Sequence, residues 1–316
     1  MRRELPFARQ RPGRGVSFRR CSLKVVRGEV LGFCFGVSNT MNMALECLRI
    51  AERKGLPCYS IGDLIHNKDV VNYFNEKGLR VIKDSDDASA GVALIRAHGI
   101  PDADKRTFKD AGFELLDSTC PTVLKGANAI RTAASQGRNI IVLGFAGHAE
   151  TLGLQGVEVE EGVVAKTHLI TSVEDAERFV KSNTLDDGNP VFVVTQTTFP
   201  RDRYEEIASI LKGRFKDIGF GNVPCPACKR RIDDAVSTAL KCDAAVVVGG
   251  ADSANTRNLA NEVRKTGRPV FFVENAAGLD DDALSKMAQY GSVALLSGSS
   301  TPMWVIEEVE ARLKEL

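Results

Sequence analysis

The chain has 316 residues, of which 43% are hydrophobic and 26% are charged, and its formal net charge is +1. This composition is typical of a soluble globular protein with a large core or a few smaller α/β units. The small net charge argues against binding to nucleic acid or a membrane surface, and no apolar run approaches the roughly eighteen residues of a transmembrane helix.

Residues 1–22 differ from the rest of the chain because seven arginines stand against a single acid, Glu4. The segment lacks the apolar stretch of a secretory signal and has no amphipathic pattern. We expect a disordered basic extension outside the fold, in a cytoplasmic protein. An arginine-rich organelle transit peptide is the alternative, and it would place the protein in a plastid.

From about residue 23, short apolar strands alternate with amphipathic helices. The expected strands cover residues 94–96, 139–143, 191–195, 244–248, 270–273 and 293–296. The expected helices cover residues 37–54, 122–135, 204–212, 255–265 and 302–314. This alternation predicts α/β architecture with largely parallel sheets.

Cys34, Cys120 and Cys225 divide the chain into three segments of similar length and similar strand–helix content. Each segment has the size of a small domain, so we expect three quasi-equivalent α/β domains at residues 23–119, 120–223 and 224–316. A trefoil arrangement of these domains around a common centre would bring the three cysteines together. This arrangement is a geometric hypothesis.

Four loops place small polar residues before a proline, at residues 97–101, 118–121, 197–200 and 299–302. Serine or threonine is a favoured N-cap, and proline is favoured at the first helical position. Each loop therefore predicts a strand end followed by a helix start. Ligands bind at this edge of an open α/β sheet, and helix N-termini bind phosphate.

The eight cysteines are many for a chain without a secretory signal, which favours metal or redox chemistry over disulfides. Cys34, Cys120 and Cys225 each stand just before an expected helix, where thiolates are stabilised. Soft thiolates select iron–sulfur clusters or zinc, and spacing alone leaves open a cluster, zinc or unrelated thiols. The remaining cysteines of the folded part are expected to be buried free thiols, apart from Cys228 in the C-x-x-C pair with Cys225.

Three of the four histidines, His66, His98 and His148, lie in polar loops. Together they could neutralise a diphosphate or relay protons, whereas His168 lacks such a context and is expected to be structural. Glu150 follows His148 closely. Its carboxyl group is a candidate proton source with a raised pKa, and an exposed surface glutamate is the alternative.

Residues 249–256 and 298–301 are rich in glycine, serine and asparagine and lie between an expected strand and an expected helix. Such segments bind anions through backbone amides and hydroxyl groups. Neither contains the Walker A or the dinucleotide-binding glycine pattern, which argues against a nucleotide triphosphatase and a conventional NAD enzyme.

The ordered set of these motifs resembles the 4-hydroxy-3-methylbut-2-enyl diphosphate reductase family. The matching pieces spread over nearly the whole chain after residue 22. They are Gly-Phe-Cys-Phe-Gly-Val at 32–37, His66-Asn67, Ala97-His98-Gly99, Thr119-Cys120-Pro121, Gly147-His148-x-Glu150, Thr195-Gln196-Thr197-Thr198, Cys225, Ser253-x-Asn255 and Gly298-Ser299-Ser300.

The resemblance implies a [4Fe–4S] cluster held by Cys34, Cys120 and Cys225, with a fourth iron free to bind the substrate hydroxyl as a Lewis acid. It implies reductive removal of that hydroxyl from (E)-4-hydroxy-3-methylbut-2-enyl diphosphate, with electrons from reduced ferredoxin or flavodoxin. The products would be isopentenyl and dimethylallyl diphosphate. Glu150, Thr197 and His148 would be the catalytic residues. The diphosphate would be bound by His66, His98, His148, Ser253, Asn255 and Ser300.

Three departures from the family pattern stand out. Ser38-Asn39-Thr40 replaces the expected basic residues, Ala254 replaces a serine, and Cys228 is an alternative third ligand to Cys225. These departures keep two other hypotheses open. One is a divergent paralogue that acts on another small allylic or phosphorylated substrate, and the other is a non-enzymatic iron–sulfur or zinc protein that senses redox state.

Overall fold

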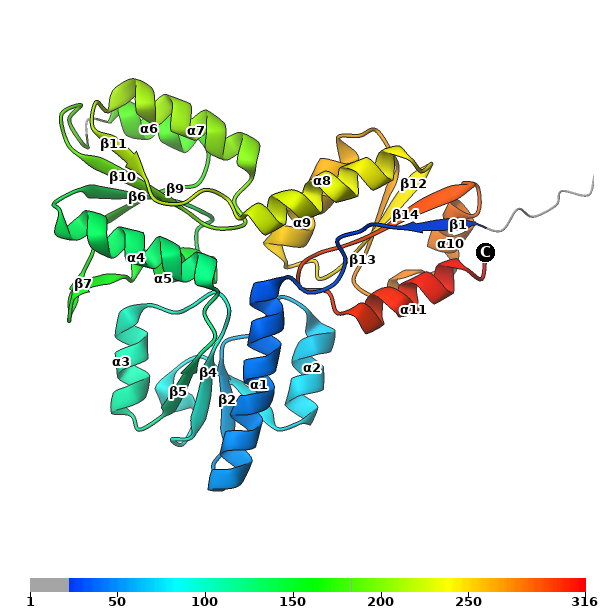
Figure 1. The fold of residues 1–316 in the computed structure, drawn as a ribbon, viewed down its shortest axis with the longest axis horizontal. Coiled ribbons are helices and arrows are strands. Elements are labelled where there is room, and N and C mark those ends of the chain that lie inside the picture. Colours follow the sequence, from blue (N-terminus) through cyan, green and yellow to red (C-terminus); the bar gives the residue numbers. More distant parts are fainter. Residues whose placement is uncertain (1–22, 183) are drawn as a thin grey trace, which may run out of the picture.

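The computed structural model describes residues 23–182 and 184–316. The expectation for residues 1–22 therefore lies outside the described residues. Three four-stranded sheets make up most of the fold, and every pair of neighbouring strands in them is parallel. The predicted α/β class with parallel sheets is confirmed. In Figure 1 the chain forms three lobes, each built on one of these sheets.

The first sheet has the strand order β3-β2-β4-β5 and lies between helices on both faces. Buried apolar side chains of α1 and α2 pack on one face, and those of α3 pack on the other. The elements are α1 (Phe35–Lys54), β2 (Cys58–Ile61), α2 (Lys68–Glu76), β3 (Leu79–Ile82), β4 (Val92–Ile95), α3 (Asp102–Asp110) and β5 (Glu114–Asp117).

The second sheet has the order β11-β10-β6-β9, with α4 and α5 packed on one face and α6 and α7 on the other. A short antiparallel hairpin, β7 (Glu158–Glu160) and β8 (Val163–Val164), is attached to it. The remaining elements are α4 (Pro121–Ser135), β6 (Asn139–Leu143), α5 (Ala149–Gln155), β9 (Thr167–Ile170), α6 (Val173–Lys181), β10 (Val191–Thr195), α7 (Arg201–Arg214) and β11 (Ile218–Phe220).

The third sheet has the order β1-β14-β12-β13. Helices α8 and α9 pack on one face, and α10 and α11 on the other. Its elements are α8 (Pro226–Leu240), β12 (Ala244–Val248), α9 (Ala254–Arg264), β13 (Val270–Val273), α10 (Asp281–Met287), β14 (Ser292–Ser297) and α11 (Met303–Leu313), together with β1 (Lys24–Arg27).

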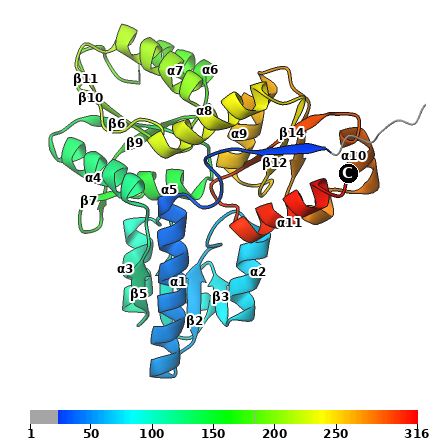
Figure 2. The ribbon, with the colours of Figure 1, turned by 45° about the vertical axis from the view of Figure 1, so that its right-hand side comes forward.

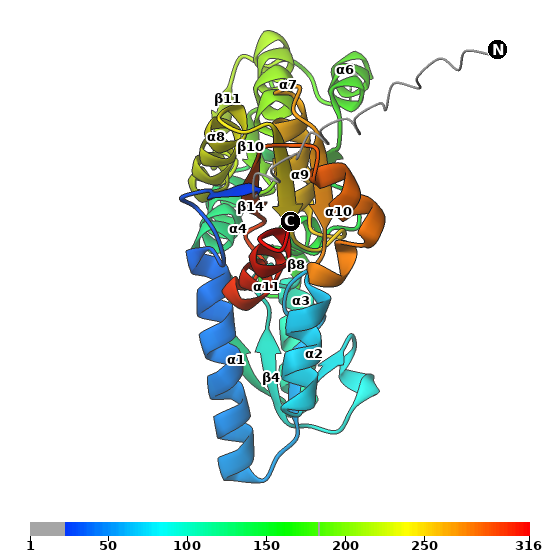
Figure 3. The same ribbon diagram turned by 90° about the vertical axis from the view of Figure 1, so that its right-hand side faces the viewer.

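The strand β1 belongs to the third sheet, whereas α1, the helix that follows it, packs against the first sheet. It pairs with β14 in parallel, so the start of the described chain and its C-terminal segment share one sheet. The C-terminal end lies close to β1 in two views (Figures 1 and 3). Division of the chain at the three cysteines thus places β1 apart from the other three strands of its sheet.

The predicted elements agree closely with the observed ones. The strands over 139–143, 191–195, 244–248 and 270–273 have the predicted bounds. Pro121 stands at the first helical position as expected, but Pro101, Pro200 and Pro302 occupy the N-cap position instead. The threonines and serines before Pro200 and Pro302 therefore do not cap the helices. None of the helices in residues 23–182 and 184–316 has the length and apolarity to span a bilayer.

Polar and aromatic contacts join the lobes. Arg106 of α3 forms two hydrogen bonds with Glu158 of β7, of 2.8 and 2.9 Å. Tyr73 of α2 and Trp304 of α11 have ring centroids 5.9 Å apart, and Figure 2 shows these two helices side by side. Buried Arg231 of α8 donates to the backbone carbonyls of Val30, Gly32 and Ser297.

Replacing Glu158 by Gln is expected to lower the urea midpoint of unfolding at neutral pH. The bidentate bond to Arg106 and the Gly162 N–H lower the pKa of Glu158 from 4.5 to about 2. A carboxyl group with a lowered pKa stabilises the fold above its ordinary pKa and loses that effect as pH falls. The difference between variant and wild type should therefore shrink between about pH 4.5 and about pH 2.

A matched control is Glu177→Gln, which removes an exposed i,i+4 ion pair with Lys181 on α6. Such surface pairs contribute little, about 0–1 kcal/mol. If both variants shift the urea midpoint equally, or if the Glu158→Gln effect does not depend on pH, the Arg106–Glu158 contact does not join the lobes as described.

Candidate active site

Three helices begin with a cysteine at the N-cap, and each helix belongs to a different lobe. Cys34 precedes α1, Cys120 precedes α4 and Cys225 precedes α8. Cys34 has extended backbone angles, Cys120 and Cys225 have similar angles to each other, and none of the three side chains forms a capping hydrogen bond. In Figure 1 the starts of α1, α4 and α8 face one another between the lobes.

The three thiols lie close together. A side chain at Gly36 would meet the Sγ of Cys120 at 2.8 Å, so only glycine permits this approach of α1 to Cys120. Burial raises the pKa of the Cys120 thiol, and neighbouring Cys34 adds a smaller rise. Cys228 lowers the pKa of the Cys225 thiol, and Thr122, in the first turn of α4, lowers it by a smaller amount. The three helix starts that carry these cysteines therefore lie near one another, and a common ligand for the three thiols stays a prediction.

This donor set fits a thiolate-bound metal group. Soft sulfur donors select iron–sulfur clusters or zinc. The hydrogen bond from Cys228 and the N–H groups of the first turn of α8 lower the pKa of Cys225 to about 6. Because the first N–H groups of a helix lack intrahelical partners and carry partial positive charge, three helix starts without capping side chains favour a bound anionic group.

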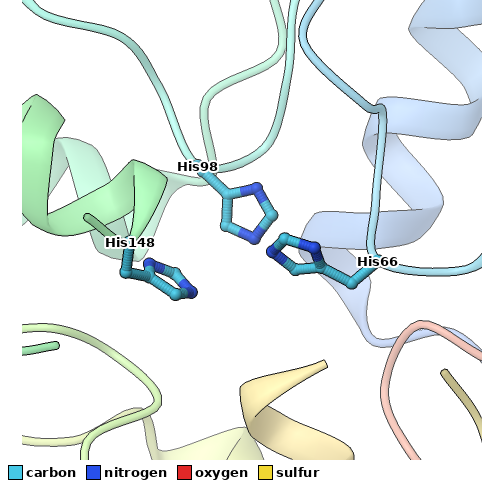
Figure 4. A group of neighbouring side chains, drawn as sticks. All are labelled: His66, His98 and His148. Carbon is cyan, nitrogen blue, oxygen red and sulfur yellow. The ribbon is translucent and has the colours of Figure 1, made fainter. Parts of the chain in front are cut away.

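Next to the cysteines, three histidines from two lobes point toward one another (Figure 4). Their ring centroids are 5.0 Å apart for His66 and His98, 5.4 Å for His98 and His148, and 5.8 Å for His66 and His148. Nε2 of His66 and Nδ1 of His98 are buried and have no hydrogen-bond partner. Such unsatisfied polar atoms indicate a ligand, because a buried polar group without a partner costs free energy.

One cavity joins these histidines to the polar segments at the starts of α9 and α11. Ser253 and Ser300 are buried there with hydroxyl oxygens 3.4 Å apart. Asn255 accepts the backbone N–H of Ser299 at 3.0 Å. The six predicted diphosphate-binding residues thus line one cavity, and Ala254 also lines it. The position at which the family resemblance led us to expect a serine therefore lies in this cavity.

Burial keeps the histidines neutral in the absence of a ligand. It lowers the pKa of His66 and His98, and it lowers the pKa of His148 to about 4, with neighbouring positive charge as a smaller cause. The sequence suggested that these histidines could neutralise a diphosphate. In the absence of an anion, however, they are uncharged hydrogen-bonding groups rather than cations.

Glu150 is fully buried in the first turn of α5, which excludes the alternative of an exposed glutamate. Its carboxylate accepts the N–H of Thr197 at 2.6 Å and the hydroxyl of Thr197 at 2.8 Å. Burial raises the pKa of Glu150 to about 7, although the two hydrogen bonds oppose this rise. His148 does not cause the shift; its Nδ1 accepts the backbone N–H of Glu150 at 3.2 Å.

Two further polar side chains support the cysteine loops. Arg231 ties the loop before Cys34 to the end of β14. Thr40 donates its hydroxyl to the carbonyls of Gly36 and Ser118, which joins α1 to the loop before Cys120. One member of the divergent Ser38-Asn39-Thr40 segment therefore helps to position two of the cysteines.

Arg96 was not identified from the sequence as a site residue. It lies at the end of β4, its Nε is buried without a partner, and its charge acts on all three clustered histidines. Its position directly before the Ala97-His98-Gly99 motif is the feature of the sequence that could have identified Arg96 as a site residue. His168 lies outside the group and packs against Phe179 at 5.3 Å, in keeping with a structural role. Cys47, Cys58 and Cys242 are buried free thiols, as predicted.

Comparisons with known proteins show the family of the chain. The family model described as LytB protein matches residues 25–314. A 4-hydroxy-3-methylbut-2-enyl diphosphate reductase from Alkaliphilus oremlandii is 31% identical over 93% of this chain and 100% of its own length. The enzyme of the same name from Nitratidesulfovibrio vulgaris is 34% identical, again over 93% of this chain and 100% of its own.

Solved structures give the same result. The E-1-hydroxy-2-methyl-but-2-enyl-4-diphosphate reductase from Plasmodium falciparum superimposes with a TM-score of 0.80 at 25% identity, over 92% of this chain and 87% of that one. A structure of (E)-4-hydroxy-3-methyl-but-2-enyl diphosphate reductase superimposes with a TM-score of 0.68 at 26% identity, over 93% and 100%. The chain therefore belongs to the LytB family of 4-hydroxy-3-methylbut-2-enyl diphosphate reductases, which confirms the resemblance drawn from its sequence motifs.

Proposed function

We propose that this chain reductively removes the hydroxyl group of (E)-4-hydroxy-3-methylbut-2-enyl diphosphate. The C–O bond breaks, two electrons and two protons enter, and water leaves with isopentenyl or dimethylallyl diphosphate. The observation that carries this proposal is the position of three N-cap cysteines beside one cavity of histidine, serine and asparagine side chains. The two curated relatives are named 4-hydroxy-3-methylbut-2-enyl diphosphate reductase, which also supports the proposal.

Cys34, Cys120 and Cys225 would hold a [4Fe–4S] cluster at the centre of a trefoil of three domains. These domains are residues 23–119, 120–223 and 224–316, except that β1 joins the sheet of the third domain. When bound, such a cluster supplies the electrons and an iron without a protein ligand that acts as a Lewis acid. Cys225 is preferred over Cys228 because it shares the N-cap position of Cys34 and Cys120, whereas Cys228 lies within the first turn of α8.

The diphosphate would lie against His66, His98, His148, Ser253, Asn255 and Ser300. Neutral imidazoles and hydroxyl groups donate hydrogen bonds to its oxygens, and the charge of buried Arg96 adds a favourable field. The bound anion would favour protonation of the histidines, because opposite charge stabilises their cationic form.

Glu150 is the proposed proton source. With a pKa of about 7 it is divided between its acid and its carboxylate form at neutral pH, which suits a group that gives and regains a proton. The Thr197 hydroxyl, 2.8 Å from this carboxylate, would orient the substrate hydroxyl and pass the proton to it. A reduced ferredoxin or flavodoxin is the expected electron donor.

A second candidate is a divergent paralogue, which the presence of Ala254 in the cavity favours. A missing hydrogen bond to a charged group costs about 1.5–3 kcal/mol when nothing replaces it. The two functions differ in turnover of the standard substrate: the reductase forms isopentenyl and dimethylallyl diphosphate at ordinary efficiency, and the paralogue does not.

Replacing Glu150 by Gln is expected to lower kcat by about 10²–10⁴-fold, because an amide cannot supply the proton. Iron content and the absorption spectrum should remain those of the wild type. The measurement is product formation with chemically reduced donor under argon. The control is Glu160→Gln, which removes an exposed carboxylate from β7. Unchanged turnover in Glu150→Gln would contradict the proton role, whereas no turnover in wild type or variant would support the redox-sensing alternative.

Binding of inorganic pyrophosphate is expected to take up protons and to tighten as pH falls from about 8 to about 6. Burial lowers the pKa of all three histidines in the free site, and the negative charge of the bound anion would raise these pKa values. Binding should therefore take up protons and should be tighter at lower pH. Titration calorimetry in buffers of different ionisation enthalpy measures this uptake directly. Affinity that is flat across this range, with no proton uptake, would show that the histidines do not become protonated when the anion binds.

A further inference from the structure

The sequence Cys225-Pro226-Ala227-Cys228 opens α8, and the proposed function uses only the first of its two cysteines. Cys225 is the N-cap, and Cys228 lies three residues later in the first turn. Each thiol shifts the pKa of the other, with that of Cys225 lowered and that of Cys228 raised, and both line one pocket. A C-x-x-C pair at a helix start is the arrangement in which disulfide oxidoreductases carry their reactive cysteines.

Cys228 also contacts Asn255, one of the residues that line the proposed diphosphate site. The Nδ2 of Asn255 donates to the Sγ of Cys228 at 3.1 Å, while the Oδ1 of Asn255 accepts the N–H of Ser299. The second cysteine is therefore held in place between Cys225 and Asn255.

Small molecules have their own route to this pair. A pocket of about 180 Å³, open to solvent, lies between the starts of α7 and α8 and the side of α9. Both Cys225 and Cys228 line it, next to Lys229. No cysteine lines the cavity of the three histidines. A reagent can thus reach the two thiols without entering that cavity.

A second pair of cysteines provides an internal comparison. The Sγ atoms of Cys47 in α1 and Cys58 in β2 are 3.3 Å apart. This separation would suit a covalent bond, but both residues are buried in the core between α1 and the first sheet. The Cys225–Cys228 pair differs because both of its residues line a pocket that is open to solvent.

We propose that Cys225 and Cys228 are a redox-active dithiol, which a small organic disulfide converts to an intrahelical disulfide when no cluster is bound. The sulfur of Cys225 attacks the small disulfide, forms a mixed disulfide and releases one small thiol. The sulfur of Cys228 then attacks Cys225 and releases the second. The two cysteines lose two electrons and two protons, and the small disulfide gains them as two thiols.

This inference rests on the proposed function only in taking Cys225 as a cluster ligand. The disulfide withholds that ligand, so an oxidised chain cannot take up iron and sulfide until the bond is reduced. The pair would then protect an empty site from irreversible oxidation of Cys225 and would couple cluster assembly to the thiol–disulfide balance.

The test uses the full chain after removal of iron with a chelator, with retained secondary structure checked by circular dichroism. The chain is incubated with glutathione disulfide, alkylated while folded, and mapped by mass spectrometry. We expect a Cys225–Cys228 disulfide, with Cys47 and Cys58 unlinked and alkylated only after unfolding. Cys228→Ser should instead carry glutathione on Cys225. Unlinked Cys225 and Cys228 in the wild type, or a Cys47–Cys58 disulfide in their place, would overturn the proposal.

Cluster uptake separates this proposal from the proposed function. Oxidised wild type should gain no visible absorption with iron and sulfide until dithiothreitol is added, whereas Cys228→Ser treated with dithiothreitol should behave like reduced wild type. Uptake by the oxidised wild type without reductant would refute the withheld ligand. A mapped disulfide in a chain that takes up no iron even when reduced would support the dithiol and contradict the cluster.

Discussion

The structure depends on the meeting of three helix N-termini, each with a cysteine at the N-cap. Three positive helix ends in one place repel one another, and their free N–H groups are not satisfied by capping side chains. Such a centre is stable when an anionic group occupies it. The surrounding contacts hold this geometry: Gly36 admits Cys120, Arg231 fixes the loop before Cys34, and Thr40 joins two of the loops.

Burial sets the chemistry of the neighbouring groups. The same dry surroundings raise the pKa of Glu150 to about 7 and lower the pKa of His148 to about 4. A carboxylic acid that holds its proton near neutral pH lies beside imidazoles that stay uncharged until an anion enters. Both shifts follow mainly from exclusion of water rather than from charge pairs, and both suit the anion binding and proton transfer proposed for this site.

Much of this could be predicted from the sequence, because strand and helix periodicity and loop composition are local. The strand over residues 244–248 and the helix starts after Cys34, Cys120 and Cys225 are examples. The pairing of β1 with β14 was not predicted, since periodicity carries no information about which strands are neighbours. Arg96 was missed for a related reason: its unpartnered buried nitrogen is visible only when distant loops are brought together.

The most direct test of the account is the iron and acid-labile sulfide content of anaerobically purified protein, measured with the absorption spectrum for wild type and single Cys→Ser variants. The account predicts about four irons and four sulfides per chain in wild type, as expected for a cluster of this type, and in Cys228→Ser. It predicts loss of both in Cys34→Ser, Cys120→Ser and Cys225→Ser. A colourless wild type that holds zinc, or a cluster that survives in Cys225→Ser but not in Cys228→Ser, would contradict the central claim.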